Sequence, residues 1–445
     1  MEAQLIEKGI LTQSLATVAA MDIYVATTGD DETGDGLVGS PYLTITRAYQ
    51  DVPYTLRHLV HIHVAAGAYT DWPQAIDNRY ELGGSLSIDG TAAMADFDAG
   101  PYTIDAGAPV ALGASKVYDI PAVGGGLTPA AWDGKFMEML DGANVGNIYA
   151  IIENDATDVR IQGGWTVGGA GDKFKIVEPG VTVALPAVDC TIKGDASSDM
   201  STWLGLVGLD LTTVDTLTAY AGNLCLQGSI LNVATLRFRD GAVRGYYSGP
   251  DATFLDVPSY ATNWAGCAVV KDSVGGKYVF CFGHTSLGAI VFLRSLDVTD
   301  ATSFQMSLVS IKNLIGYGMD IYNSVGVCKI TTSYIEAKST HNAIQISDCA
   351  YFSIDMYVQA GVAAIHAKSM CIGRVKELVG VDANVANALL LENGSRISIA
   401  AAGCTLVGAT GAGTAIKWAS GAADSAYPAA NLEVNDALGA QVVGT

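Results

Sequence analysis

The sequence feature that most constrains the fold is a repeat of 21–24 residues in the second half of the chain. Ile344–Ile346 aligns with Ile365–Ala367 at an offset of 21, and Leu389–Leu391 follows at a further 24. Upstream, offsets of 23 to 24 bring in Ile321, Asn323, Ile330 and Tyr334. A period of this length is typical of solenoids, whose repeats bury apolar faces against their neighbours. The repeat therefore predicts a parallel β-helix.

The first seventy residues contain a strand, a turn, a helix and a second strand in close succession. Residues 22–26 alternate in the way of a half-buried strand, and so do residues 60–64. Residues 29–36 combine glycine with aspartate, which favours a compact turn. Between them, Ile45, Ala48 and Tyr49 are spaced for one face of a short helix. Such a helix would cover the open end of a β-helix.

This opening segment resembles that of pectate-lyase-like right-handed parallel β-helix proteins. The shared features are the Gly/Asp-rich turn, a short helix introduced by Pro41 and Thr44, and a strand that leads into Gly67-Ala-Tyr69. That superfamily includes polysaccharide lyases and hydrolases and many bacteriophage tailspikes. The resemblance implies an all-β, right-handed parallel β-helix with a short N-terminal capping helix. It implies no particular reaction, because the fold hosts both enzymes and inert stalks.

Composition narrows the classes of partner. The chain has 445 residues and a net charge of −21, with 24 Lys and Arg against 45 Asp and Glu. No basic cluster occurs, which disfavours nucleic-acid binding, and no apolar run is long enough to span a membrane. Charged residues make up only 16%, against roughly 25% in typical domains. Part of the surface is therefore expected to be covered by partner chains, most simply in a homotrimer.

The eight cysteines lie at least fourteen residues apart, so close Cys-x-x-Cys sites are absent. Cys328, Cys349 and Cys371 follow the repeat at intervals of 21 and 22, which predicts thiols stacked in a core rather than disulfides. Unpaired cysteines indicate assembly in a reducing cytoplasm. Residues 9–20 are interrupted by polar side chains and lack a positive start, so we expect no secretory signal there.

We expect five segments along the chain. Four follow one another: an N-terminal anchor at 1–20, the β-helix opening with irregular first coils at 21–145, the parallel β-helix at 146–400, and a C-terminal cap or intersubunit segment at 401–445. The fifth lies inside the β-helix, where residues 240–310 admit an inserted β lobe of antiparallel hairpins. Residues 71–145 form either wide loops or a small lobe. Residues 147–163 run apolar triplet, polar turn, apolar triplet, glycine, which predicts one coil of the β-helix.

Paired carboxylates are the groups that cleave glycosidic bonds. Asp155 and Asp158 share a predicted coil, and Arg160 follows them. They are the best candidates for paired catalytic carboxylates, or for calcium ligands if the chain is lyase-like. Aspartate is also a common turn former, and the fuller catalytic motifs of the resembling families are not present. The catalytic residues therefore stay unknown, and no other cofactor is expected.

Two further patterns admit a binding role. His61 and His63 lie on one face of a strand, a spacing that suits a metal, but no third ligand is evident nearby. We interpret them as the outward face of a half-buried strand and expect no metal. Outward aromatic residues could instead stack on sugars, although the same residues fit an interface or a loop core. These candidates are Trp72, Trp132, Trp165, Trp203, Trp264, Tyr246 and Tyr247.

Two classes of function follow from these observations. The first is a virion structural protein: a trimeric tailspike, tail fibre or decoration protein that attaches to host surface glycans. Residues 1–20 would then join it to other virion proteins, and the protein would leave the host cytoplasm as part of the particle. The alternative is a polysaccharide-degrading lyase or glycoside hydrolase on the same fold.

Overall fold

The computed structural model describes the chain in two parts. From residue 16 to residue 239 it is described except for 74, 77–79, 82–83, 107–108, 112–116, 123–125, 163–168, 187–189, 194–203, 221–222 and 226–227. From residue 262 onward the description is limited to the strands. In this described part the single α-helix is α2 (Ile45–Asp51), and nearly all other regular structure is β-strand. The predicted all-β class is confirmed.

The first strands form a parallel sheet in the order β1 (Met21–Val25), β3 (Val60–Val64), β7 (Leu86–Asp89), β17 (Leu204–Val207), β19 (Asn223–Cys225) and β21 (Thr262–Ala265). Its register places Ile23, Ile62 and Ile88 side by side, and all three are buried. Because alternate residues of a strand point to opposite faces, their neighbours face outward. This buried row is the apolar face that the alternating sequence pattern predicts for β1 and β3.

The predicted capping helix is present. Thr44 is its N-cap, and the Thr44 hydroxyl accepts a hydrogen bond from the backbone N–H of Arg47 at 3.1 Å. The three residues predicted to share one face, Ile45, Ala48 and Tyr49, are all buried, and the helix packs on β1 and β3. Two short parallel strands lie beside it, β2 (Thr55–Leu56) and β6 (Tyr80–Glu81).

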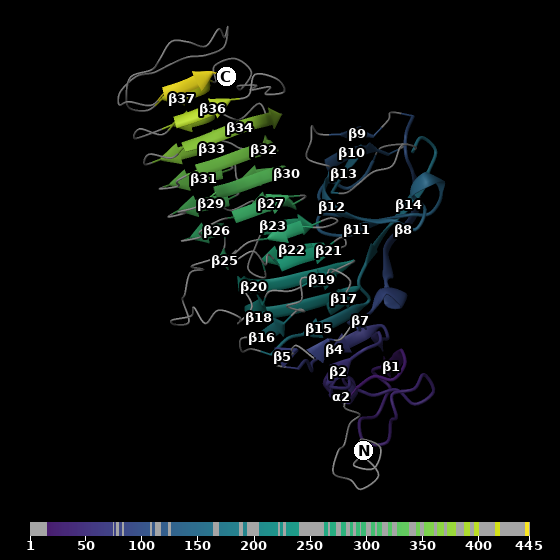
Figure 1. Ribbon diagram of the computed structural model, residues 1–445. Helices are drawn as coiled ribbons and strands as arrows, with labels where there is room; N and C mark the ends of the chain where they lie inside the picture. Colours follow the sequence, from purple (N-terminus) through teal and green to yellow (C-terminus); the bar gives the residue numbers. More distant parts are fainter. Residues whose placement is uncertain are drawn as a thin grey trace.

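A second set of strands stacks in parallel over the same part of the molecule (Figure 1). It begins with β4 (Gly67–Tyr69) and continues through β15 (Val181–Ala184), β18 (Leu209–Tyr220), β20 (Ser229–Arg239) and β22 (Ala268–Asp272). Beside it, β5 (Ala75–Ile76) pairs with β16 (Cys190–Lys193), which pairs with β18. Each chain segment thus lies on the preceding one in the same direction.

The strands of the second half form two further parallel rows. One row is β26 (Ser295–Thr299), β29 (Met319–Tyr322), β31 (Ile344–Ser347), β33 (Ala363–Lys368), β35 (Asn387–Leu391) and β37 (Thr414–Trp418). The other is β27 (Phe304–Ser307) and β28 (Val309–Asn313), both on β30 (Val327–Ala337), then β32 (Tyr351–Gln359), β34 (Ile372–Val379), β36 (Arg396–Ile399) and β38 (Gln441–Gly444). Ile344 pairs with Ile365, and Ile365 with Leu389. The register predicted from Ile344 to Leu389 is confirmed, whereas Ile321 pairs with Ile346, an offset of 25 rather than the predicted 23 to 24.

A lobe of antiparallel strands interrupts this stack and lies beside it (Figure 1). Its sheet order is β8 (Ala95–Thr103), β14 (Lys173–Glu178), β11 (Phe136–Met139), β12 (Ile148–Asn154), β13 (Asp158–Gln162), β10 (Val117–Pro121) and β9 (Val110–Ala111). Two 3₁₀ turns, Thr91–Ala93 and Gly142–Asn144, lie around it. Gly67 pairs with Val181, 114 residues later, whereas Val181 pairs with Leu209, only 28 residues later. The lobe is therefore an insertion between two consecutive strands of the stack.

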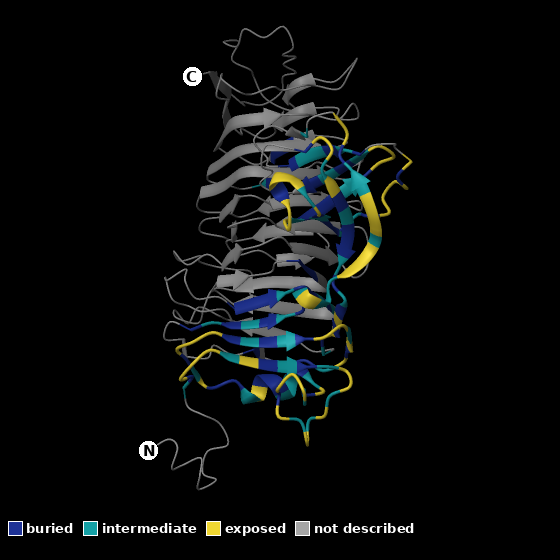
Figure 2. Cartoon of the chain, turned by 90° about the vertical axis from the view of Figure 1, so that its right-hand side faces the viewer, coloured by how far each residue is buried: buried dark blue, intermediate teal, exposed yellow. Residues whose placement is uncertain are grey.

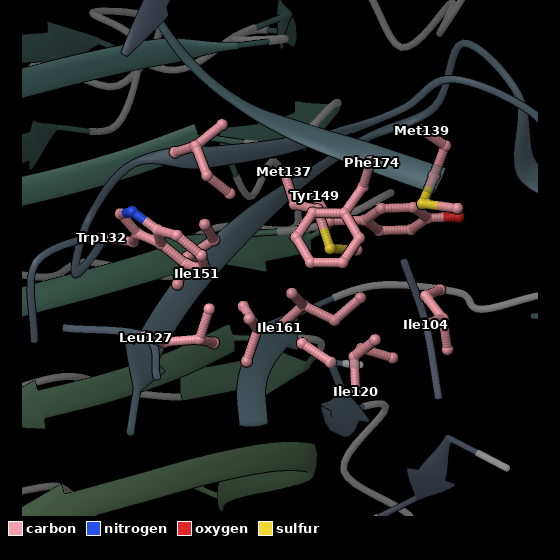
Figure 3. Packing of buried hydrophobic residues seen from close by; sticks show 13 residues of the cluster. Ile104, Ile120, Leu127, Trp132, Met137, Met139, Tyr149, Ile151, Ile161 and Phe174 are labelled. Atoms are coloured by element: carbon pink, nitrogen blue, oxygen red, sulfur yellow. The ribbon is translucent and has the colours of Figure 1, made fainter. Parts of the chain in front are cut away.

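The lobe has its own core. A bridge between Ile104 and Ala122 joins β8 to the far side of the sheet and closes it on itself. The enclosed face buries Trp132, Tyr149 and Phe174 among aliphatic side chains (Figure 3). The opposite face buries Phe136 and other residues of the lobe against Ile230 of β20. The central strands of the lobe are thus buried on both faces, whereas most residues of β8 are exposed (Figure 2). The cluster around Ile230 joins this core to the stack.

The prediction that residues 147–163 form one coil of a parallel β-helix is wrong. β12 and β13 are antiparallel to each other and belong to the lobe. Only three residues separate β12 from β13, and so short a connection joins antiparallel strands, whereas parallel strands need a long crossover. The irregular stretch before it contains part of the lobe, as one of the two stated alternatives predicts.

Antiparallel pairing also occurs within residues 262–313. β23 (Lys277–Cys281) is antiparallel to β22 and β28, β25 (Val291–Leu293) to β20 and β26, and β24 (Thr285–Leu287) to β21. These strands lie in the same sheets as the parallel rows. The pairing across 146–400 is therefore mixed rather than parallel throughout. The division of the chain into domains stays a prediction.

Several predictions fall partly or wholly outside the described residues. One is the stacking of the thiols of Cys328, Cys349 and Cys371. Cys349 and Cys371 are not described, and only the backbone of Cys328 is described, in β30. Residues 1–15 also lie outside, but Ala16 forms a bridge with Thr55, and the Thr17 hydroxyl accepts bonds from the N–H groups of Arg57 and His58. The end of the predicted anchor segment thus packs on its own chain. None of the described helices has the length and apolarity to cross a membrane.

Candidate functional site

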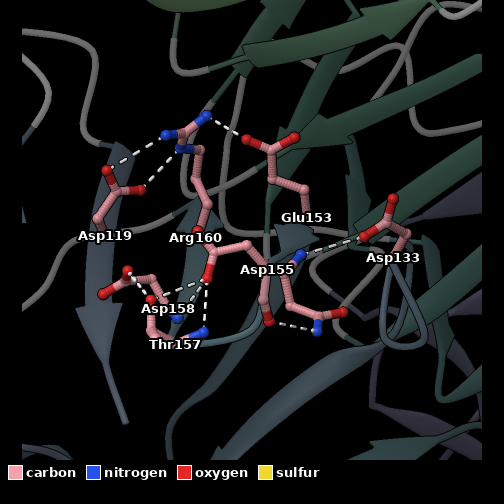
Figure 4. Close-up of polar contacts among 8 residues, drawn as sticks. Asp119, Asp133, Glu153, Asp155, Thr157, Asp158 and Arg160 are labelled. Carbon is pink, nitrogen blue, oxygen red and sulfur yellow. Dashed lines mark hydrogen bonds and ion pairs between the residues drawn. The ribbon is translucent and has the colours of Figure 1, made fainter. Parts of the chain in front are cut away.

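Asp155 and Asp158 lie in the turn that joins β12 to β13 (Figure 4). Oδ1 of Asp155 accepts hydrogen bonds from the backbone N–H groups of Thr157 and Asp158, each at 2.7 Å, and from the Thr157 hydroxyl at 3.1 Å. The backbone N–H of Asp155 donates to the carbonyl of Asp158 at 3.0 Å. Oδ2 of Asp158 accepts a second contact of the Thr157 hydroxyl at 2.7 Å. The carboxylate of Asp155 therefore closes the turn.

Arg160 lies on β13, two residues after Asp158, and contacts carboxylates on both neighbouring strands. Its Nε and Nη2 donate to Oδ1 and Oδ2 of Asp119 at 2.7 and 3.2 Å, and its Nη1 donates to Oε1 of Glu153 (Figure 4). Asp119 is opposite Arg160 on β10, and Glu153 is opposite it on β12. The guanidinium is only 18% exposed. Arg160 thus bridges β10, β13 and β12.

A bulge in β12 makes this arrangement possible. Ile151 is opposite Ile161 and Glu153 is opposite Arg160, so Ile152 is the extra residue between them. Ile151 is buried in the enclosed core of the lobe, and Ile152 on the face toward the stack. Glu153 is thereby placed beside Arg160. The sequence analysis missed Asp119 and Glu153, because their proximity to Arg160 depends on the antiparallel pairing of the lobe.

The turn is also connected to the core of the lobe. The Asn154 side chain is buried, and its Nδ2 donates to the carbonyls of Thr128 and Asp155 at 2.8 and 3.2 Å. Its Oδ1 accepts from the backbone N–H of Trp132 at 2.9 Å, while its own N–H donates to Asp133. The turn is therefore held by the buried side chain of Asn154 as well as by the carboxylate of Asp155.

The electrostatics at Asp155 favour its charged carboxylate. Hydrogen bonds from the Thr157 backbone are the main cause of a lowered pKa of Asp155, and the charge of Arg160 contributes to it. A general acid for glycoside cleavage requires the opposite shift, a raised pKa that keeps the proton near neutral pH. The cluster can act as a set of fixed negative charges beside one guanidinium. Its contacts match those of a folded turn and a cross-strand ion-pair network.

Two of the aromatic candidates for sugar stacking, Trp72 and Trp132, are buried at 4% and 3% exposure. The prediction that these two face outward is wrong, because each ring is packed inside the structure. The structure gives no side-chain position for the other five. Trp165, Trp203, Tyr246 and Tyr247 lie outside the described residues. Only the backbone of Trp264 is described, in β21, where it pairs with Leu224 of β19. A glycan-binding role for these five residues stays a prediction.

The structure brings a third ligand to the two histidines for which the sequence showed none. Asp22 of β1 is opposite His61 of β3, and Asp22, His61 and His63 offer ligand atoms within 4.8 Å of one another. Asp22 is 39 residues before His61 in the sequence. The three residues become neighbours only through the parallel pairing of β1 with β3. The alternating apolar pattern of both strands is the sequence signal from which this pairing could have been inferred.

Comparisons with known proteins add two distant structural similarities. No protein-family model matches the chain, and no curated protein matches it. The structure of XylC in complex with xylose is 10% identical, with 94% of this chain and 70% of that chain covered and a TM-score of 0.18. The tailspike gp61 of Pseudomonas phage phi297 is 9% identical, with 88% and 72% covered and a TM-score of 0.25. At such TM-scores neither similarity bears on function.

Proposed function

We propose that this chain is a right-handed parallel β-helix protein of a phage virion, a tailspike, tail fibre or decoration protein that attaches to host surface glycans. The observation that carries the proposal is the stack of in-register parallel strands behind an opening of strand, short helix and strand. That opening is the segment whose sequence resembles pectate-lyase-like β-helix proteins. Rigid solenoids expose long lateral surfaces, which suit an extended polysaccharide.

The inserted lobe supports a binding role. It forms a separate antiparallel body whose core is closed by the bridge between Ile104 and Ala122, and it is attached along one side of the stack through the cluster around Ile230. Functional loops and lobes are commonly carried by a rigid scaffold in this way. The sugar would be held by outward aromatic residues, with Trp165, Trp203, Trp264, Tyr246 and Tyr247 as the candidates.

The proposed assembly is a homotrimer joined to other virion proteins through residues 1–20. The support is the low share of charged residues, 16% with 50% hydrophobic, which leaves weakly charged surface for partner chains to cover. Light scattering of the purified chain is expected to give three times the mass of one chain. A stable monomer at micromolar concentration would refute this assembly.

The alternative function is a polysaccharide lyase or glycoside hydrolase with Asp155, Asp158 and Arg160 as the reacting groups, and calcium if it is a lyase. The observation in its favour is the grouping of carboxylates around Arg160. The hydrogen bonds that close the turn and the lowered pKa of Asp155 count against it.

One experiment separates the two functions. The full chain is incubated with immobilised host capsule, lipopolysaccharide and pectin-like glycans, and both retention and release of new reducing ends or unsaturated products are measured. We expect retention on at least one glycan without cleavage. Release of defined oligosaccharides that is lost in Asp155→Ala or Asp158→Ala would favour the enzyme. Absence of both retention and release would refute both functions for these glycans.

A further inference from the structure

A cluster of two histidines and one aspartate lies on the outward face of the first parallel strands. Val60, Ile62 and Val64 of β3 are buried, so the alternate residues His61 and His63 face outward. The register of β1 with β3 places Asp22 directly beside His61. The three side chains offer two imidazole nitrogens and one carboxylate oxygen within 4.8 Å of one another.

Contacts among these side chains already orient them toward one another. Nε2 of His63 lies 2.9 Å from Oδ1 of Asp22. The His63 ring stacks on Tyr24 with a centroid separation of 4.7 Å and an interplanar angle of 20°. The His61 and His63 rings pack edge to face, and their centroids are 5.4 Å apart. Tyr24 therefore restricts the orientation of one of the two rings.

The backbone beneath the cluster is held on both sides. β3 lies between β1 and β7, and the buried row of Ile23, Ile62 and Ile88 packs directly under the outward residues. On β7, Asp89 is opposite His63, but Oδ1 of Asp89 accepts bonds from the N–H and the hydroxyl of Thr91 at 2.7 and 2.5 Å. The ligand set thus consists of Asp22, His61 and His63 on rigid strands.

The donor atoms decide which cation this cluster suits. Calcium and magnesium take oxygen ligands almost exclusively, whereas two imidazoles with one carboxylate are a common set for zinc, with a water in the fourth position. We infer that Asp22, His61 and His63 form a Zn²⁺ site that this chain uses to tie β1 to β3. Bonds of about 2.0–2.1 Å require the ligand atoms to move closer than 4.8 Å. The side chain of Asp22, which is 59% exposed, has the freedom to make that movement.

The site would act on the end of a sheet. β1 pairs with β3 on one side and is the terminal strand of its sheet in the described structure. A metal held by one ligand from β1 and two from β3 crosslinks this terminal strand to the next one. Because binding to the folded state alone stabilises it by mass action, zinc should raise the thermal midpoint of the chain.

The test uses the full chain after removal of metal with a chelator. Isothermal titration with Zn²⁺ is expected to show one site per chain, and Co²⁺ is expected to give the intense visible absorption of a four- or five-coordinate ion. Asp22→Asn, His61→Gln and His63→Gln should each raise the Kd for Zn²⁺ by at least tenfold, since even outer partners of metal ligands change affinity by about 10–100-fold. His58→Gln is the matched control, because His58 is an exposed histidine outside the cluster.

Circular dichroism of each metal-free variant establishes that it is folded before the titration. Loss of binding in the three variants with retention in His58→Gln supports the site, and so does a zinc-dependent rise in the thermal midpoint that the same three variants abolish. If the parent chain does not bind Zn²⁺, or if all three variants bind it as the parent does, the inference is wrong and the cluster is only a hydrogen-bonded pair of His63 with Asp22. Glycan binding is measured separately and does not decide this outcome.

Discussion

The structure gives Asp155 a different role from the catalytic one that the sequence suggested. As part of a pair with Asp158 it resembled a catalytic carboxylate, but three hydrogen-bond donors converge on its Oδ1 within the β12–β13 turn. Donors that hold a carboxylate in its charged form lower its pKa, as found for Asp155. The same bonds that stabilise the turn make this group a poor proton donor.

The lowered pKa of Asp155 predicts a pH dependence of stability. A carboxyl group whose pKa is lower in the folded state stabilises the fold above its unfolded pKa of about 3.9. That contribution is lost as the pH falls through the folded value. Asp155→Ala is expected to reduce the free energy of unfolding by about 1 kcal/mol at pH 7. Urea unfolding at pH 7 and at pH 3 checks it: the difference from the parent should narrow at pH 3, and an equal difference at both pH values would contradict it.

Arg160 provides a second prediction at this scale. Arg160→Met leaves Asp119 and Glu153 on either side of β13 without their shared cation, in a position where the guanidinium was 18% exposed. We expect the free energy of unfolding to fall by about 1–3 kcal/mol, the cost of leaving polar partners unsatisfied. The loss should shrink at high salt, which screens the two carboxylates.

The matched control for Arg160→Met is the same substitution combined with Asp119→Asn and Glu153→Gln. Removing both negative charges should recover a good part of the lost stability. If the triple variant is no more stable than Arg160→Met, repulsion between the carboxylates is not the cause. Denaturant unfolding of the three proteins gives the comparison.

At the scale of elements, the lobe depends on its enclosed core. Phe174 of β14 is fully buried and stacks with Tyr102 at a centroid distance of 5.5 Å. Phe174→Ala removes most of this side chain from a closed barrel with little room to collapse, so we expect a loss of about 3–5 kcal/mol. Hydrogen exchange should show the loss first in β8 and β11, the two strands that pair with β14.

Phe97, which is 43% exposed on β8 of the same lobe, provides the control for Phe174. Phe97→Ala removes the same atoms from a partly solvated position and should cost much less. Equal losses for the two substitutions would mean that the enclosed core is not packed as the structure shows. Thermal and urea unfolding of both variants make the comparison.

Several elements could be predicted from the sequence because their signals are local. The faces of β1, β3 and α2 follow from alternation and helical spacing, and the row from Ile344 to Leu389 follows from the repeat. The lobe could not be predicted in detail, because its hairpins carry the same apolar triplets as a coil. Likewise Asp119 beside Arg160 and the third ligand beside His61 are set by pairing between strands that are distant in sequence.

At the scale of the whole molecule, parallel strands stack in rows, and the chain segments that connect them differ in length. The chain accommodates an inserted lobe between β7 and β15 while the strands on either side remain in parallel register. A one-dimensional stack tolerates such an insertion because each coil contacts only its neighbours. The proposed attachment to glycans depends on this rigid stack as a support for the lobe and the outward residues.

The most direct test of the stack is a set of distances along one row of strands. Asp297, Asp320, Gln345, His366, Leu390 and Lys417 occupy successive strands in register. With adjacent strands about 4.8 Å apart, four steps along the row span about 19 Å and five steps about 24 Å. Four positions of this row are replaced by cysteine and spin-labelled in pairs, in chains diluted with unlabelled protein.

Double electron–electron resonance on labelled pairs is the measurement. The pair Asp297→Cys with Leu390→Cys and the pair Asp320→Cys with Lys417→Cys each span four steps, so both backbone separations should be about 19 Å; Asp297→Cys with Lys417→Cys should give about 24 Å. The native cysteines are first replaced by serine or alanine in the parent. Distances that rise with the number of strands crossed support the stacked coils. Unequal distances for the two four-step pairs, or a five-step distance no longer than either, would contradict them.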